Sequence, residues 1–160
     1  ERRYVRLRLQ THNSPRAWFD LETGTRTAVD ASAADATITY VGNGDAPVGF
    51  DVAGDDFLLG IDAIYPEYER GAKFILVDAR PPADYNLHTI VGAISIPYYD
   101  MPACADTIPE DAWVVTFCAC PHDESVAAAE YLTEAGHEKV VVMDEGYIVW
   151  RLERGYPTTD

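Results

Sequence analysis

Cysteine is scarce in this sequence, whose 160 residues contain only Cys104, Cys118 and Cys120. An odd, low number of cysteines argues against a small fold held together by disulfide bonds. It fits one reactive thiol accompanied by others that take no part in chemistry. Long apolar runs are missing too: because no stretch reaches about 18 apolar residues, the sequence predicts no membrane-spanning helix. The apolar content of 48% is nevertheless sufficient for a proper core.

Positive charge is scarce outside the first residues. Residues 1–26 hold six arginines against three acidic residues, a net +3, whereas the rest of the chain holds 24 acidic and six basic residues, a net -18. An acidic body repels nucleic acid and anionic lipid. The charge therefore predicts no nucleic-acid partner, and its simplest interpretation is solubility.

The start of the chain leaves the localisation unknown. The first residue is Glu1 rather than Met, and no signal peptide is recognisable. It stays open whether an N-terminal segment was removed before Glu1, and therefore whether the protein is exported or lipid-anchored.

The N-terminal third is predicted to be rich in strands. Residues 4–10 alternate apolar and polar side chains, and residues 17–21 and 36–41 form further short β-prone runs. We interpret residues 1–55 as a small β-rich extension, with a possible role in binding a protein partner. It carries no chemical motif, and His12 and Trp18 are expected to be surface or packing residues.

Residues 56–160 are predicted to form a single α/β domain. Apolar strands and helices alternate along it, and such alternation is typical of a parallel sheet with helices on both faces. The predicted strands are 74–78, 93–97, 113–117 and 139–143; the predicted helices are 61–70, one turn at Pro81–Pro82, a helix capped by Asp123, Glu124 or Ser125 that continues through Val126–Leu132, and 146–154. In such sheets, sites lie at the carboxyl ends of the strands.

Cys118 stands at the most informative of these strand ends. Trp113–Phe117 is a continuous β-prone run, Cys118 opens the loop that follows, and a helix comes next. Backbone N–H groups and the positive end of the helix dipole converge at such a position, which favours a thiolate or a bound anion. Cys104, in contrast, is interpreted as a buried spectator.

Four stretches, in order, resemble the rhodanese (sulfurtransferase) family over about residues 57–158. They are Asp78-Ala-Arg80 with Asp84-Tyr85, His88-Thr-Ile-Val-Gly92-Ala-Ile-Ser-Ile-Pro97, Phe117-Cys118 with Ser125, and Glu145-Gly146 leading to Trp150 and Gly155-Tyr-Pro157. The resemblance implies a rhodanese-like fold and a sulfurtransferase that forms a persulfide on Cys118, with a small sulfur donor, a thiol acceptor and no cofactor. The spacing of Arg80 and Asp84 also predicts a structural ion pair between them.

The active loop departs from the family pattern in two ways. The family places four residues between its cysteine and an arginine, whereas the loop here runs from Cys118 through five residues, Ala119 to Asp123, before Glu124. This longer loop is the length found in a related group of cysteine phosphatases, but Glu124 stands where they need an arginine. A carboxylate there repels anions, so we predict weak activity on thiosulfate and no useful phosphatase activity.

The remaining loop residues allow more than one role. Cys120, in the variant Cys-x-Cys-Pro motif that ends at Pro121, could resolve a persulfide on Cys118 or be a packing thiol. His122 could assist a sulfur species or face solvent. Cys118, Cys120 and His122 could together ligate zinc or copper, but no fourth ligand lies at motif spacing, so no metal is predicted.

Three hypotheses of different classes follow. The first is an enzyme, a rhodanese-like sulfurtransferase that uses Cys118. The second is a non-catalytic rhodanese-like binding module. The third is a thiol redox switch formed by Cys118 and Cys120.

Overall fold

The computed structural model describes residues 38–50, 57–119 and 122–159, together with the backbone of three N-terminal strands. These strands, β1 (Tyr4–Leu7), β2 (Ala17–Asp20) and β3 (Arg26–Ala28), form an antiparallel sheet in the order β1-β2-β3. The first two lie within runs predicted as strands. The third strand was predicted at residues 36–41. The structure describes residues 38–41 of this range, and they form no strand, so the prediction is wrong for them. The division of the chain at residue 55 stays a prediction.

A five-stranded parallel sheet is the centre of the remaining chain. Its strands are β4 (Leu58–Leu59), β5 (Ile75–Asp78), β6 (Ile94–Ser95), β7 (Val114–Phe117) and β8 (Val140–Met143). They lie in the order β4-β8-β7-β5-β6, and every pair is parallel. This confirms the predicted parallel sheet. The short edge strand β4 was not predicted, because two residues carry no recognisable periodicity.

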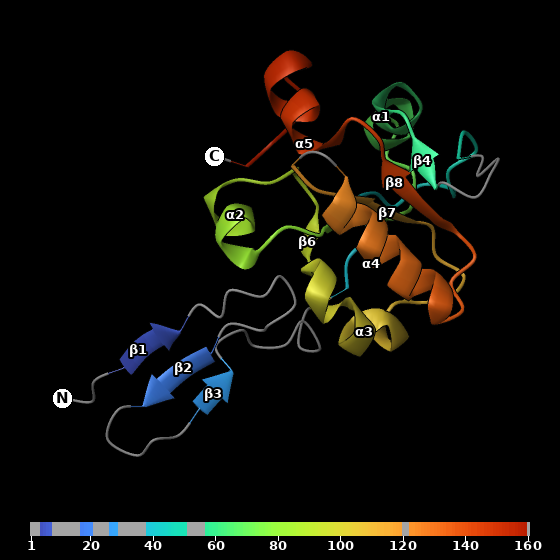
Figure 1. Ribbon diagram of the computed structural model, residues 1–160. Coiled ribbons are helices and arrows are strands. Elements are labelled where there is room, and N and C mark those ends of the chain that lie inside the picture. The colour runs from blue at the N-terminus through green and yellow to red at the C-terminus, as the bar shows by residue number, and fades with distance from the viewer. Residues whose placement is uncertain are drawn as a thin grey trace.

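Helices cover both faces of this sheet (Figure 1), as predicted. They are α1 (Ile61–Glu69), α2 (Pro82–Leu87), α3 (Met101–Cys104), α4 (Asp123–Glu134) and α5 (Gly146–Ile148), with short 3₁₀ turns η2 (Tyr98–Asp100) and η3 (Ala105–Thr107). α5 continues as a π-helical turn, η4 (Val149–Glu153), so the predicted last helix is present with a wider final turn.

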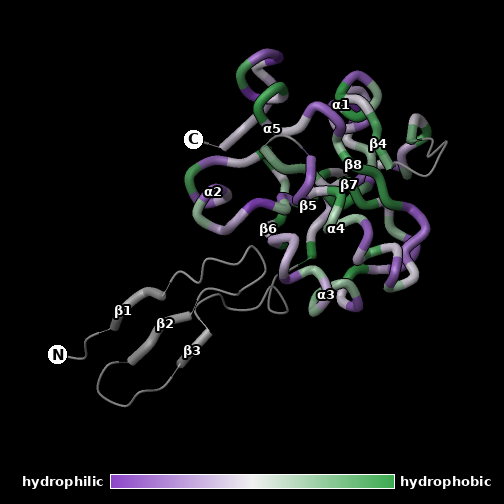
Figure 2. Tube along the Cα trace, viewed as in Figure 1, coloured by the Kyte–Doolittle hydropathy of each residue, from purple (hydrophilic) through white to green (hydrophobic). Residues whose placement is uncertain are grey.

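The core follows from the alternation of side chains along the central strands. Val114 faces α3 and α4, whereas its neighbour Val115 faces α1 and α5. All four residues of β5, β7 and β8 are buried, as expected for strands covered on both faces. Figure 2 shows this apolar centre as green segments in β7 and β8, with hydrophilic segments toward the outside. In the described part of the chain, no helix combines the length and apolarity needed to cross a membrane.

Candidate active site

Cys118 directly follows β7 and is buried, with 1% of its surface exposed. Its sulfur lies 3.3 Å from the Oγ of Ser125. The backbone N–H groups of Ser125 and Glu124 also act on this sulfur and lower the pKa of its thiol. The cysteine therefore sits at the point where β7 gives way to α4, as the strand–loop–helix pattern predicts.

The start of α4 explains these N–H groups. The helix begins at Asp123 after His122, so the prediction that Asp123, Glu124 or Ser125 would cap it is wrong. These three residues form its first turn, where N–H groups have no partner within the helix. Such groups can stabilise negative charge on sulfur.

Ser125 connects the sulfur to the loop backbone. Its hydroxyl donates to the carbonyl oxygen of His122 at 3.0 Å while its Oγ lies beside the sulfur of Cys118. A hydroxyl has one proton, so it can donate either to this carbonyl or to a Cys118 thiolate. Ser125 is fully buried, which makes it a fixed part of the sulfur's surroundings.

Two opposing effects set the acidity of Cys118. Burial raises its pKa above the ordinary value of 9.0, and the negative charge of Glu124 raises it further, whereas the hydrogen bonds from Ser125 and Glu124 lower it. The net direction is upward, so the thiol form predominates at neutral pH. Cys104 is also buried, and burial, followed by the negative charge of Asp100, raises its pKa to about 11.

Replacing Ser125 with Ala should slow alkylation of Cys118 by iodoacetamide about tenfold at neutral pH, because a hydrogen bond to a charged group is lost. In both proteins the rate should keep rising with pH beyond about pH 9, since the pKa lies above that value. Mass spectrometry of the Cys118 peptide measures the rate. Thr133→Ala, which removes another hydroxyl bonded within α4, is the matched control. Equal rates in Ser125→Ala and the wild type would contradict the assigned role of this hydroxyl.

The carboxylate of Glu124 lies among like charges. Burial raises its pKa, and Asp84, Asp78 and Asp123 raise it further, while only Arg80 acts in the opposite direction among these causes. No ion pair to Glu124 occurs among the described residues. Glu124, the residue predicted to stand at the family's arginine position, thus adds negative charge near Cys118.

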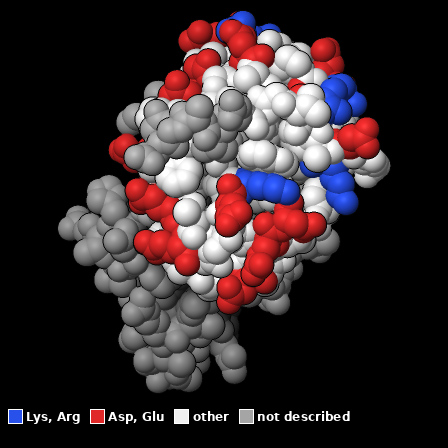
Figure 3. Space-filling view, turned by 90° about the vertical axis from the view of Figure 1, so that its right-hand side faces the viewer, with Lys and Arg blue, Asp and Glu red and all other residues white. Residues whose placement is uncertain are grey.

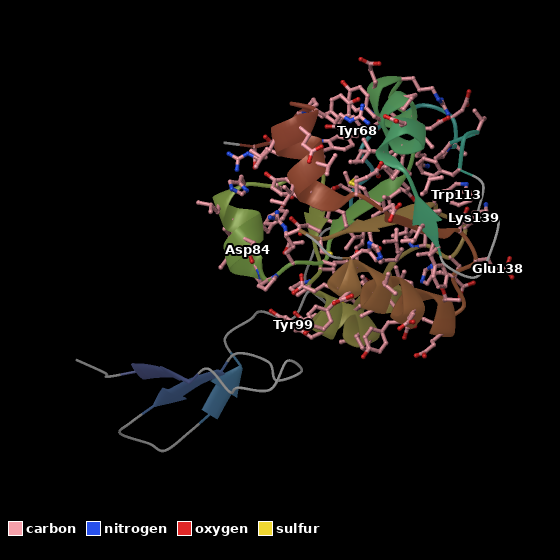
Figure 4. The ribbon with its side chains drawn as sticks, turned by 45° about the horizontal axis from the view of Figure 1, so that its top comes forward. Tyr68, Asp84, Tyr99, Trp113, Glu138 and Lys139 are labelled. Carbon is pink, nitrogen blue, oxygen red and sulfur yellow. The ribbon has the colours of Figure 1, made fainter. Side chains whose placement is uncertain are left out.

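Arg80 forms its ion pair with Asp78 and not with Glu124. Its guanidinium makes a two-pronged ion pair with Asp78, at 2.9 Å from Nε and 2.7 Å from a terminal nitrogen, and also donates to the carbonyl oxygen of His88. Thr89 donates to the same carboxylate at 2.7 Å. The predicted partner Asp84 is wrong: it lies exposed on α2 (Figure 4), and its charge acts on Arg80 only at longer range. Residues two apart at a strand end share a face, which favours Asp78 as the partner.

Tyr147 was not among the predicted site residues, yet it contacts the backbone of Cys118. Its backbone N–H donates to the carbonyl oxygen of Cys118 at 2.8 Å, and its hydroxyl lies 3.0 Å from Nδ1 of His88. The guanidinium carbon of Arg80 lies 4.1 Å from the centre of its ring. Its position directly after Gly146, in the family's closing element, was the only available signal.

The other predicted loop residues are only partly described. His122 lies at the protein surface, with its Nδ1 3.2 Å from the carbonyl oxygen of Asp144 and 3.7 Å from the carboxylate of Asp144. Ala119 is half-buried. Cys120 and Pro121 lie outside the described residues. Among those that are described, no group of three potential ligands is placed to hold a metal ion.

Comparison with known proteins identifies the family of this fold. The model of the rhodanese-like domain family matches residues 66–153. A thiosulfate sulfurtransferase GlpE of Tolumonas auensis is 31% identical over 84 residues, which cover 52% of this chain and 78% of that protein. A sulfurtransferase of Allochromatium vinosum is 33% identical over 76 residues, covering 48% of this chain and 70% of that protein.

Solved structures share the fold. A rhodanese-like domain from Anabaena superposes with a TM-score of 0.59 at 22% identity, covering 66% of this chain and 80% of that one. A protein from Bacillus halodurans gives a TM-score of 0.60 at 20% identity, covering 65% of this chain and 77% of that one. With the family model matching more than half of its residues, the chain belongs to the rhodanese-like domain family.

Proposed function

We propose that the protein is a sulfurtransferase that carries a sulfane sulfur as a persulfide on Cys118. The observation that carries this proposal is the placement of the Cys118 sulfur beside the first turn of α4, within reach of the Ser125 hydroxyl and of two backbone N–H groups. Relatives that are named sulfurtransferases support it.

The proposed reaction has two steps. The Cys118 thiolate attacks the outer sulfur of a donor, so a new S–S bond forms on Cys118 while the donor's S–S bond breaks and its remainder leaves with the electron pair. An acceptor thiolate then attacks the outer sulfur of this persulfide, becomes a persulfide itself and restores the Cys118 thiolate. The Ser125 hydroxyl and the N–H groups of α4 stabilise the negative sulfur in both steps.

A hydropersulfide is the preferred donor in this proposal, and thiosulfate is a poor one. Thiosulfate is a dianion, and Glu124 offers it a carboxylate where the family offers an arginine. Arg80 cannot compensate, because it is 4% exposed and bound to Asp78. Two like charges about 6 Å apart repel by roughly 3 kcal/mol at an effective dielectric constant near 20, and screening by salt and water reduces this to about 1 kcal/mol.

A sulfur-loading experiment tests the proposal. The protein is incubated with a neutral alkyl hydropersulfide or with thiosulfate, and persulfides are trapped by alkylation and located by mass spectrometry. We expect one added sulfur atom on Cys118 in the wild type and in Cys104→Ser, and none at this position in Cys118→Ser. Thiosulfate should load Cys118 more slowly than the hydropersulfide, and Glu124→Arg should raise the thiosulfate rate about tenfold.

The matched control for charge is Glu134→Arg, the same change at an exposed residue of α4. Ten residues of helix separate it from Glu124, about 15 Å, so its thiosulfate rate should stay near that of the wild type. Equal acceleration by both variants would show that only the overall charge matters. Brisk loading of the wild type by thiosulfate would overturn the donor assignment.

A non-catalytic binding module is the second candidate, because Cys118 is buried and burial raises the pKa of its thiol. Absence of any sulfur on Cys118 after incubation with either donor would favour this candidate. A disulfide between Cys118 and Cys120, lost in Cys120→Ser, would instead favour the redox switch.

A further inference from the structure

A cavity of about 430 Å³ lies between the edge strand β4 and helix α4. Phe57, Leu58, Val126 and Ala127 supply its apolar lining, and Asp123, Glu130 and His122 supply its polar groups. We call it the edge cavity. No part of the sulfur chemistry proposed above uses it.

One face of α4 forms a wall of the edge cavity. Val126 and Ala127 lie three and four residues after Asp123, and Glu130 lies four and three residues after them, which is the spacing of side chains on one helix face. The two carboxylates therefore flank two apolar side chains. Both acidic residues are exposed, and neither has an ion-pair partner in the part of the chain that the structure describes.

The opposite wall contains an unusual backbone conformation. Phe57 has a φ of 57°, in the left-handed region that bulky residues rarely adopt. Its carbonyl oxygen accepts a hydrogen bond from the N–H of Val142 at 2.8 Å, which anchors this conformation to the sheet. Strained residues tend to occur at functional sites, because the surrounding structure must hold them in place.

His122 connects the edge cavity to the active loop. The residue lines the cavity, its carbonyl oxygen accepts the hydroxyl of Ser125, and the same hydroxyl oxygen lies 3.3 Å from the sulfur of Cys118. The edge cavity and the reactive sulfur are therefore linked through His122 and Ser125.

The charge on this side of the molecule decides which ligand fits. Figure 3 shows acidic side chains spread over this face, with basic ones at its centre and toward its right-hand edge. An apolar lining favours a hydrocarbon or aromatic body, whereas unpaired carboxylates favour a cation and disfavour an anion. A neutral ligand would satisfy only the first of these requirements.

We propose that the edge cavity binds a small organic cation with an apolar body, and that it holds the thiol that accepts sulfur from Cys118. The second half of this proposal, that the cavity holds the acceptor thiol, rests on the proposed function. The first half, that the cavity binds an organic cation, does not. The cationic group meets Asp123 or Glu130, and the body lies on Phe57, Leu58, Val126 and Ala127.

A binding experiment on the full chain tests the first half. Phenethylamine, phenethyl alcohol and hydrocinnamate share a body and differ in charge, and their binding is followed by NMR chemical shifts. We expect phenethylamine to bind about fivefold more tightly than the alcohol, because an exposed ion pair contributes up to about 1 kcal/mol, and hydrocinnamate to bind weakest. Glu130→Gln should reduce this preference and Ala127→Leu should weaken all three ligands by filling the cavity, whereas Glu134→Gln is the charge control.

Equal binding of the amine and the alcohol, or an unchanged preference in Glu130→Gln, would overturn the cation site. A loss of preference that is equally large in Glu134→Gln would overturn it as well, since the effect would then come from overall charge.

Single-turnover discharge of the Cys118 persulfide tests the second half. The acceptors are para-(aminomethyl)thiophenol and para-(hydroxymethyl)thiophenol. The amine should discharge the wild type with a lower KM, and Ala127→Leu should raise this KM while leaving the loading of Cys118 unchanged. The same KM for both thiols would overturn the acceptor assignment alone, whereas absence of a persulfide on Cys118 would overturn the proposed function and leave the binding result to decide the cation site.

Discussion

Replacement of Asp78 with Ala should destabilise the protein by about 3–5 kcal/mol, the usual consequence of removing one partner from a buried ion pair. The Asp78 carboxylate is completely buried at the end of β5. It accepts hydrogen bonds from the Arg80 guanidinium at 2.7 and 2.9 Å, from the Arg80 backbone N–H at 3.1 Å and from the Thr89 hydroxyl at 2.7 Å. A single side chain thus satisfies donors from two segments of the chain.

The large effect comes from what the substitution leaves behind. Arg80 is 4% exposed and lies against the ring of Tyr147, so it cannot turn into solvent without displacing its neighbours. A buried guanidinium that has lost its counter-charge is strongly unfavourable. Because a typical domain is stable by only about 5–15 kcal/mol, the variant should be partly unfolded or unfold at much lower denaturant concentration.

Urea denaturation followed by circular dichroism measures this effect, with Asp84→Ala as the matched control. Asp84 is exposed on α2, and a surface carboxylate in the first turn of a helix contributes about 0.3–1 kcal/mol. The midpoint for Asp84→Ala should therefore stay near that of the wild type. Equal losses in the two variants would show that Arg80 depends on both carboxylates.

The sequence predicted those parts of the fold that are determined by residues close together in the chain. Three of the buried strands are near-continuous apolar runs, and the glycines and prolines between them mark the turns. The position of Cys118 followed from the same pattern, because a strand end next to a helix start is recognisable from residues 113–132 alone.

Two predictions, the partner of Arg80 and the start of α4, were wrong because the local backbone geometry differs from the one that was assumed. The spacing of four between Arg80 and Asp84 describes neighbours on a helix, but Asp78-Ala79-Arg80 leaves the end of a strand, where residues two apart share a face. Likewise α4 begins at Asp123, whereas a cap at Asp123, Glu124 or Ser125 would make it begin one to three residues later. That difference turns the N–H groups of Glu124 and Ser125 toward sulfur.

Other features arise between segments far apart in the sequence. Tyr147 meets Cys118 and His88, which lie 29 and 59 residues before it, and only the folded sheet brings them together. The edge cavity depends in the same way on β4 and α4. Apart from the position of Tyr147 directly after Gly146, neither feature has a signature in the sequence, because both depend on contacts between distant segments.

Replacing Gly146 with Ala should impair both stability and the chemistry of Cys118. Gly146 has a φ of 72°, and a Cβ added there would lie 2.8 Å from the carbonyl oxygen of Cys118 and 3.1 Å from that of Ala119. The left-handed conformation costs a residue with a Cβ about 1–2 kcal/mol. Relief of the contact should cost a further 1–3 kcal/mol, roughly the range for overpacking, and should push the active loop away from α5.

Gly155→Ala is a control that measures only the free-energy cost of the left-handed backbone conformation. Gly155 has a φ of 64°, but a Cβ added there would meet no atom of the described residues within 4 Å. Gly155→Ala should therefore lose only the 1–2 kcal/mol or so of the left-handed conformation. Its rate of persulfide formation on Cys118 should equal that of the wild type.

The difference between the two variants isolates the contact with the active loop. In Gly146→Ala the Cys118 carbonyl must move, and its hydrogen bond from the N–H of Tyr147, 2.8 Å in the native protein, is then strained or lost. A shift of about 1 Å in a reacting group can slow a reaction on the order of a hundredfold, so we expect a slowing of at least tenfold. Urea denaturation gives the stability difference and the persulfide-trapping assay gives the rate. If both variants lose the same stability and both load Cys118 at the wild-type rate, the packing of Gly146 against the loop does not position the cysteine.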